Sequence, residues 1–158
     1  MNIDIIAVGK IKEKFFRDAI EEYSKRLSAF VKLNIIEVPD EKIPDNASDK
    51  IIENIKDAEG KKILSKLRQQ STVVAMCIEG KQYSSEDIAD FLAQTANTSS
   101  AITFIIGGSL GISDEVKKRA QLNMSFGKIT LPHQLMRVVL AEQIYRGYKI
   151  INNQSYHK

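Results

Sequence analysis

The chain has 158 residues, of which 43% are hydrophobic and 27% are charged, as is ordinary for a globular protein. This length suits one domain with a sizeable core, so a single domain over residues 1–158 is expected. Two histidines and one cysteine exclude an internal disulfide and offer no metal-ligand pattern, so no metal is expected. The absence of a secretory signal and of any apolar run of membrane-spanning length predicts a cytoplasmic protein without a membrane partner.

The formal net charge of +3 is unevenly distributed along the chain. From Asn123 onward there are five basic residues and one acid, which gives +4, so the preceding residues sum to −1. This excess favours a polyanionic partner such as RNA. A C-terminal helix with a few solvated cations explains the charge equally well.

Apolar strand-like runs alternate with helix-period segments along the first half of the chain. In chain order we expect a strand at residues 2–8, a helix around 15–27, a strand at 33–38, a polar loop at 39–49 and a helix reaching residue 67. Ser48 can cap this last helix, and Gly60 interrupts its pattern.

The alternation continues through the second half. We expect a strand at 71–78, a turn at 79–81, a helix to residue 96 capped by Ser84 or Ser85, a strand at 101–106, a helix opened by Ser113, a short strand near 124–130 and a helix from Pro132 to about Ile150. Residues 152–158 are polar, and their composition predicts a frayed tail. The series as a whole predicts an α/β fold with a mostly parallel sheet flanked by helices.

The glycine turn Gly107-Gly108-Ser109-Leu110-Gly111 follows the strand at 101–106. Its spacing matches neither the dinucleotide-binding fingerprint nor a phosphate-binding loop. A tight strand-to-helix turn is one interpretation. A ligand site is the other, because ligands of open α/β sheets bind at the carboxyl ends of the strands.

Arg137 is at odds with its position in an early turn of the last predicted helix. A cation there opposes the positive end of the helix dipole at a cost of about 0.3–1 kcal/mol. A bound anion near that end would explain it, and so would a solvent-exposed side chain or an acid elsewhere in the fold. His133 lies four residues earlier on the same face, so the two side chains are neighbours.

Three motifs together resemble the ribosomal RNA large subunit methyltransferase H family, which belongs to the SPOUT class. They are Ile106-Gly107-Gly108-Ser109-x-Gly111, the run from Leu131-Pro132-His133-Gln134 to Tyr145-Arg146, and the closing Tyr156-His157. The segments Ala7-Val8-Gly9-Lys10 and Ile36-Glu37-Val38-Pro39 are similar too, so the resemblance covers essentially the whole chain.

The resemblance implies a SPOUT-type fold with a C-terminal trefoil knot, working as a homodimer that binds S-adenosyl-L-methionine. It implies methylation of N3 of a pseudouridine in a stem-loop of large-subunit (23S) ribosomal RNA, on assembled 70S ribosomes. The implied cofactor contacts are Met76, Gly107, Gly108, Gly127, Lys128, Ile129, Thr130, Leu131 and Pro132. The implied catalytic and substrate-handling residues are His133, Arg137, Tyr156 and His157.

These residue types suit methyl transfer to an imide nitrogen, which must lose its proton around the transfer step. Arg137 can stabilise the resulting negative charge, and His133 or His157 can accept the proton or a hydrogen bond. Lys10, Lys12, Lys14 and Lys128 are candidate contacts to rRNA phosphates. Two other interpretations are a non-catalytic ribosome- or RNA-binding module and a flavodoxin-like phosphate or nucleotide binder. The absence of a phosphate-loop Ser/Thr/Gly cluster after the first strand argues against the second.

Overall fold

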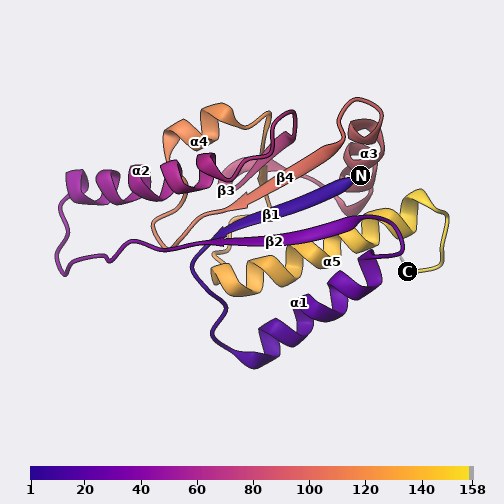
Figure 1. Ribbon diagram of the computed structural model, residues 1–158, viewed down its shortest axis with the longest axis horizontal. Coiled ribbons are helices and arrows are strands. Elements are labelled where there is room, and N and C mark those ends of the chain that lie inside the picture. The colour runs from indigo at the N-terminus through magenta and orange to yellow at the C-terminus, as the bar shows by residue number, and fades with distance from the viewer. Residues whose placement is uncertain (157–158) are drawn as a thin grey trace.

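Five parallel strands form one sheet whose spatial order differs from their order in the chain. The computed structural model describes residues 1–156. The strands are β1 (Asn2–Val8), β2 (Lys32–Val38), β3 (Thr72–Gln82), β4 (Ala101–Ile106) and β5 (Leu122–Ser125). They lie in the order β2-β1-β4-β3-β5, and every strand pairs in parallel with its neighbour (Figure 1). The predicted parallel α/β sheet is confirmed.

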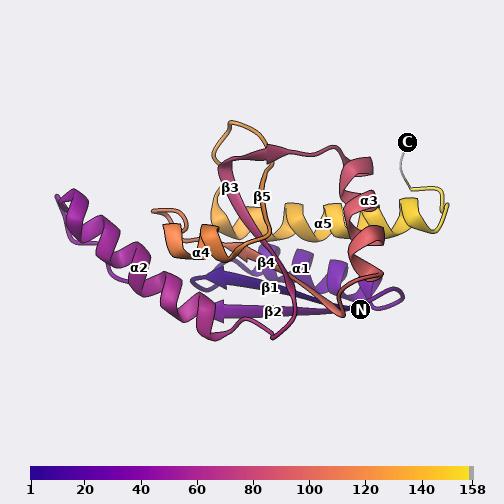
Figure 2. The same ribbon diagram turned by 90° about the horizontal axis from the view of Figure 1, so that it is seen from above.

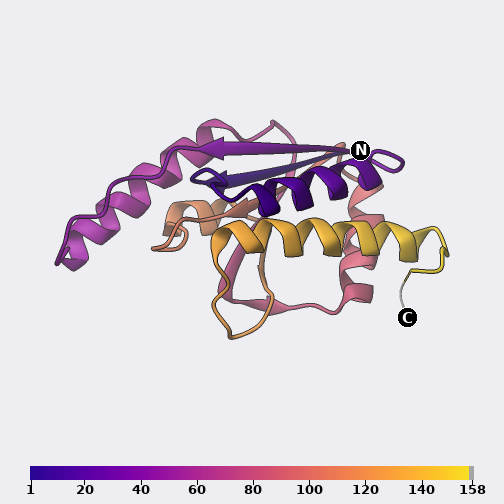
Figure 3. The ribbon, with the colours of Figure 1, turned by 90° about the horizontal axis from the view of Figure 1, so that it is seen from below.

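Helices cover both faces of this sheet, which makes three layers. They are α1 (Lys14–Leu27), α2 (Asp49–Ser65), α3 (Ser85–Ala96), α4 (Asp114–Arg119) and α5 (His133–Ile151). Leu27, Leu92 and Leu140 bring α1, α3 and α5 into one core, and Ile63 and Val116 bring α2 and α4 into a second core on the other face. Figures 2 and 3 show these two faces from above and below.

Local sequence explains where most elements begin. All six residues of β4 are buried, as expected for a strand covered on both faces. Serine side chains cap three helices by accepting a hydrogen bond from a first-turn amide: Ser48 for α2, Ser84 for α3 and Ser113 for α4. At α3 the cap is reciprocal, because Asp87 accepts a bond from the Ser84 amide at 2.9 Å.

The helix α2 runs through Gly60 without a break, so the expected interruption does not occur. A Cβ atom at Gly60 would collide with Ser113, at the start of α4. Close packing between α2 and the start of α4 therefore requires glycine at this position, and this requirement outweighs its low helix propensity.

The strand β3 is longer than the sequence predicts, and the expected turn at 79–81 is wrong. β3 continues to Gln82, and both Met76 and Lys81 pair with Met124 of β5. Residues 77–80 therefore form a bulge between the two pairings. A Cβ atom at Gly80 would lie 2.7 Å from the backbone of residues 123 and 124, so the bulge rests directly on β5. β5 in turn ends at Ser125, earlier than the strand expected near 124–130.

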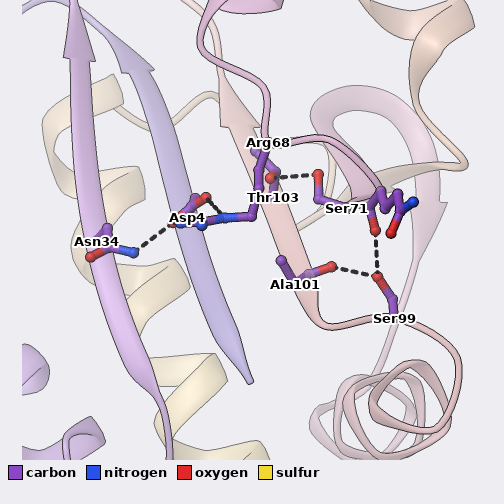
Figure 4. A network of polar contacts seen from close by, with 8 residues as sticks. Asp4, Asn34, Arg68, Ser71, Ser99, Ala101 and Thr103 are labelled. Atoms are coloured by element: carbon purple, nitrogen blue, oxygen red, sulfur yellow. Dashed lines mark hydrogen bonds and ion pairs between the residues drawn. The ribbon is translucent and has the colours of Figure 1, made fainter.

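A polar network ties the strands together away from their carboxyl ends (Figure 4). The buried Asp4 carboxylate of β1 accepts hydrogen bonds from Asn34 of β2 at 2.7 Å and from Arg68 at 3.0 and 3.2 Å. Ser71 and Thr103 share a buried hydrogen bond of 2.9 Å. The buried side chains of Asp4, Ser71 and Thr103 are thus paired, as burial requires. This network does not involve the carboxyl ends of the strands.

Within residues 1–156, no helix combines the length and the apolar character needed to span a bilayer. The same residues contain no cluster of three histidine, cysteine or carboxylate side chains able to hold a metal ion.

Candidate active site

A cavity of about 520 Å³ opens where the carboxyl ends of β3 and β4 meet the start of α5. This volume falls within the range of small-molecule sites, and the position is where parallel α/β sheets bind ligands. Three segments form most of its walls: the end of β3 with its bulge, the glycine turn after β4, and residues 124–133, which lead from β5 into α5. In Figure 1 this end of the sheet is on the left, where α5 begins.

The glycine turn after β4 folds back on itself. The Gly111 amide donates a hydrogen bond to the Gly108 carbonyl oxygen at 3.0 Å, and the two residues form an isolated antiparallel bridge. A Cβ atom at Gly107 would lie 2.8 Å from both the Gly111 carbonyl carbon and the Ile112 side chain. Gly111 has φ +89°, a conformation that favours glycine. The tight turn is confirmed, and the turn also lines the cavity, so a ligand site at this motif stays a prediction.

The segment between β5 and α5 presents backbone to the cavity. Gly127 has φ +116°, and its amide and carbonyl both hydrogen-bond the Ser125 hydroxyl at 3.1 Å. Beyond it, the Ile129 side chain is 73% exposed and lies on the cavity wall. Ile78, from the β3 bulge, is also exposed on this wall. Two exposed isoleucines on a cavity wall offer apolar contact to a bound molecule.

The structure brings together most of the residues that the resemblance implies for the cofactor. The ones that line the cavity are Met76, Gly107, Gly108, Gly127, Ile129, Thr130, Leu131 and Pro132. Lys128 is exposed and does not line it. The set comes from three separate segments, so only the folded chain assembles it.

His133 lines the cavity from the first residue of α5. Its Nδ1 atom is buried and has no hydrogen-bond partner among the described residues. Burial lowers the pKa of His133 below its ordinary value, and the nearby Arg137 cation lowers it further. The imidazole is therefore neutral near pH 7 and able to accept a proton or a hydrogen bond.

Arg137 is fully buried and does not line the cavity. Its guanidinium donates hydrogen bonds to Glu37 Oε2 at 3.0 Å, to the Gly9 carbonyl oxygen at 2.8 Å and to the Val8 carbonyl oxygen at 3.2 Å. Desolvation lowers the pKa of Arg137, and the Glu37 carboxylate acts against this. The sequence allows three explanations for Arg137, and the structure shows one of them: pairing with an acid elsewhere in the fold, Glu37. These bonds fasten α5 to the ends of β1 and β2.

Tyr156 packs against α5, so the frayed tail predicted from composition is wrong at this residue. Its hydroxyl donates a hydrogen bond to Glu142 Oε2 at 2.9 Å, and its ring meets Tyr145 edge-on with centroids 5.0 Å apart. Glu142 is nine residues along α5 from His133, which corresponds to about 14 Å. Tyr156 therefore does not reach the cavity of its own chain. His157, expected to act beside it, lies outside the described residues.

The β3 bulge brings to the cavity polar residues that the sequence does not predict there. Glu79 forms an ion pair with Lys117 of α4, and both line the wall together with Cys77. Hydrogen bonding to Lys117 lowers the pKa of Glu79, and the same bond raises the pKa of Lys117. The letters Glu-Gly-Lys suggest a turn, and no local signal distinguishes a turn from a bulge in a continuing strand.

The fold and the site together define a parallel α/β protein with a small-molecule cavity at the carboxyl ends of its strands. Residues 1–157 match the family model described as "Predicted SPOUT methyltransferase". A similar solved structure, a probable methylase family protein from Haemophilus influenzae Rd KW20, has a TM-score of 0.54 at 11% identity. The alignment covers 99% of this chain and 70% of that one, and at this identity it supports the fold alone.

Named relatives identify the particular family within the SPOUT methyltransferases. Proteins named "Ribosomal RNA large subunit methyltransferase H" from Clostridioides difficile (strain 630) and Clostridium beijerinckii (strain ATCC 51743 / NCIMB 8052) are 54% and 56% identical to this chain. A protein of the same name from Ligilactobacillus salivarius (strain UCC118) is 54% identical. Each alignment covers 100% of both chains. The chain belongs to the ribosomal RNA large subunit methyltransferase H family of SPOUT methyltransferases, which confirms the resemblance seen in its motifs.

Proposed function

We propose that this protein transfers a methyl group from S-adenosyl-L-methionine to N3 of a pseudouridine in large-subunit ribosomal RNA, acting on assembled ribosomes. One observation carries the proposal: the glycine turn after β4, the segment before α5 and His133 enclose one cavity at the carboxyl ends of the strands. The names of the relatives give the class of reaction and of substrate.

The cavity fits the proposed cofactor in size and in chemistry. Its volume of about 520 Å³ suits a nucleoside-sized molecule. Met76, Ile129 and Leu131 supply apolar surface for an adenine ring, and Gly127, where an added Cβ atom would meet nothing within 4 Å, leaves its backbone open to close approach. When bound, S-adenosyl-L-methionine supplies an electrophilic methyl group on a sulfonium sulfur that leaves as a neutral thioether. The residues of this chain then have to orient the RNA base and take its proton.

His133 is the residue that we propose to accept this proton. The imidazole would take the N3 proton of the target base and so free the N3 lone pair for attack on the methyl group that the cofactor would supply. The lowered pKa of His133 keeps it neutral and ready for this role near pH 7. His157 is the alternative acceptor.

Arg137 is proposed to stabilise the negative charge that develops on the base. In the folded chain its guanidinium is bonded to Glu37 and to the Gly9 carbonyl oxygen, and a Cβ atom at Gly9 would lie 3.6 Å from His133 Cε1. These contacts support a positioning role for the first turn of α5. Direct contact with the substrate stays a prediction.

We further propose that residues 1–158 form one knotted domain that works as a homodimer. Leu135, Val138 and Val139 of α5 are only half-buried in the single chain, which leaves apolar surface for a second copy. Because Tyr156 docks about 14 Å or more along α5 from its own cavity, a dimer allows the tail to serve the cavity of the partner.

The test is methyl transfer from a radiolabelled donor to ribosomes, separated subunits and free rRNA, followed by mapping of the labelled base. We expect label in large-subunit rRNA with intact ribosomes as the best substrate. A non-catalytic RNA-binding module would incorporate no label and would give no heat with S-adenosyl-L-methionine in calorimetry. A His133→Asn variant should bind the cofactor with unaltered affinity and lose methyl transfer.

A further inference from the structure

Phe15 is a large aromatic side chain that the fold leaves in water. It is the second residue of α1, and 65% of it is exposed. Phe16 is half-buried, and its ring centroid lies 4.4 Å from that of Phe15, with the planes tilted by 52°. Leaving such a ring exposed forgoes about 1.5–3 kcal/mol of burial free energy. Phe15 is thus held against a second ring without being buried by it.

Cationic residues flank Phe15 in the sequence. Those within five residues of Phe15 are all exposed: Lys10, Lys12, Lys14 and Arg17. The single carboxylate of residues 10–17 is Glu13. Lys14 also contacts Asp18, but this pair is open to solvent on both sides and contributes little. Residues 10–17 are therefore positively charged as a stretch, which complements an anionic polymer.

This surface lies beside the residue proposed to act on the base. The Lys12 amide donates a hydrogen bond to Gln134 Oε1 at 3.0 Å, and Gln134 is next to His133 in the first turn of α5. A Cβ atom at Gly9 would lie 3.6 Å from His133 Cε1. Phe15 follows Lys12 by three residues, which span about 11 Å at most. Figure 1 shows that α1 and α5 begin at the same end of the molecule.

An exposed ring among lysines at the edge of a site is the arrangement with which proteins bind single-stranded RNA. Bases stack on the aromatic face while cations follow the phosphates, and each stack is worth about 1–3 kcal/mol. We propose that Phe15 is a stacking platform for an unpaired nucleotide of the rRNA substrate, flanking the target base. This inference rests on the proposed function and adds a substrate-binding surface to it.

The experiment measures steady-state methyl transfer to ribosomes by the full chain and by Phe15→Ala, Phe15→Leu and Phe15→Tyr. We expect Phe15→Ala to raise the KM for ribosomes about 5- to 150-fold, with kcat and the affinity for S-adenosyl-L-methionine retained. Phe15→Leu, which keeps apolar bulk without a ring, should resemble Phe15→Ala, and Phe15→Tyr should remain near the unaltered chain. Ile51→Ala is the matched control: this isoleucine is 40% exposed at the start of α2, on the other face of the sheet, and should change nothing.

Three results would overturn the inference. An unchanged KM in Phe15→Ala means that the ring does not contact RNA. Full activity of Phe15→Leu means that apolar bulk suffices and that no base stacks. A change in the sedimentation coefficient of Phe15→Ala means that a second copy of the chain covers the ring. Absence of methyl transfer by the unaltered chain would instead refute the proposed function, so the two failures are distinguishable.

Discussion

Substitution of Arg137 tests whether the buried guanidinium holds the site together. Arg137→Met keeps a comparable length but removes the charge and three hydrogen bonds, to Glu37 and to the carbonyl oxygens of Val8 and Gly9. Removal of one partner from a buried pair costs about 3–5 kcal/mol. Because 39% of the Glu37 side chain is exposed, water can solvate the carboxylate that remains, so we expect about 3 kcal/mol. For a domain of this size, that lowers Tm by about 6–12 °C.

The partner of Arg137 supplies the second corner of a double-mutant cycle. Glu37→Gln keeps an oxygen that can accept from Arg137 and from the Ile11 amide, both now at 3.0 Å from Glu37 Oε2. It exchanges a charged acceptor for a neutral one, which costs about 1 kcal/mol. The double variant should lose less than the sum of the two, because the contact is already broken in Arg137→Met.

Urea unfolding measures these free energies, and an NMR titration of His133 provides an independent readout. The Arg137 charge contributes to the lowered pKa of His133, so Arg137→Met should raise that pKa. A Tm within 2 °C of the unaltered protein, together with an unchanged His133 titration, would refute the reasoning. Two further assays apply to Arg137→Ala. This variant should abolish methyl transfer and, in calorimetry, leave the affinity for S-adenosyl-L-methionine largely intact. Normal methylation by this variant would mean that the role given to Arg137 is wrong.

Three further substitutions test other features of the fold and site. Gly80→Ala should cost about 1–3 kcal/mol in urea unfolding and weaken S-adenosyl-L-methionine binding in calorimetry, because the new methyl group meets the β5 backbone; unaltered binding would contradict the close contact. Burial raises the pKa of Glu59, so its charged form destabilises the fold as pH rises through that raised pKa. Glu59→Gln should therefore raise Tm at pH 7, with the gain vanishing below the ordinary carboxyl pKa of about 4.3, and a pH-independent gain would exclude titration as the cause. Tyr156→Phe loses the hydrogen bond to Glu142 and should lower stability by about 1 kcal/mol at most while reducing methyl transfer much more; equal losses would make the tail structural.

Local patterns in the sequence determined most of the element boundaries. The limits expected for β1 and β4 are those observed, because both strands are apolar runs bounded by polar or glycine residues. Ser48, Ser84 and Ser113 cap helices as expected, since a cap depends on residues only three positions away. The candidate cofactor residues came from motif resemblance, which carries tertiary information that periodicity lacks.

Contacts between distant residues were decided only by the tertiary structure. Glu37 and Arg137 are 100 residues apart, and nothing in the neighbourhood of either specifies the other. The bulge of β3 exists because both Met76 and Lys81 pair with Met124, and the packing of β3 against β5 determines this pairing. Phe15 looks like an ordinary core position at helical spacing, yet it is exposed. Whether a side chain at this position is buried depends on which distant part of the fold packs against it. The neighbouring residues in the sequence do not specify that part.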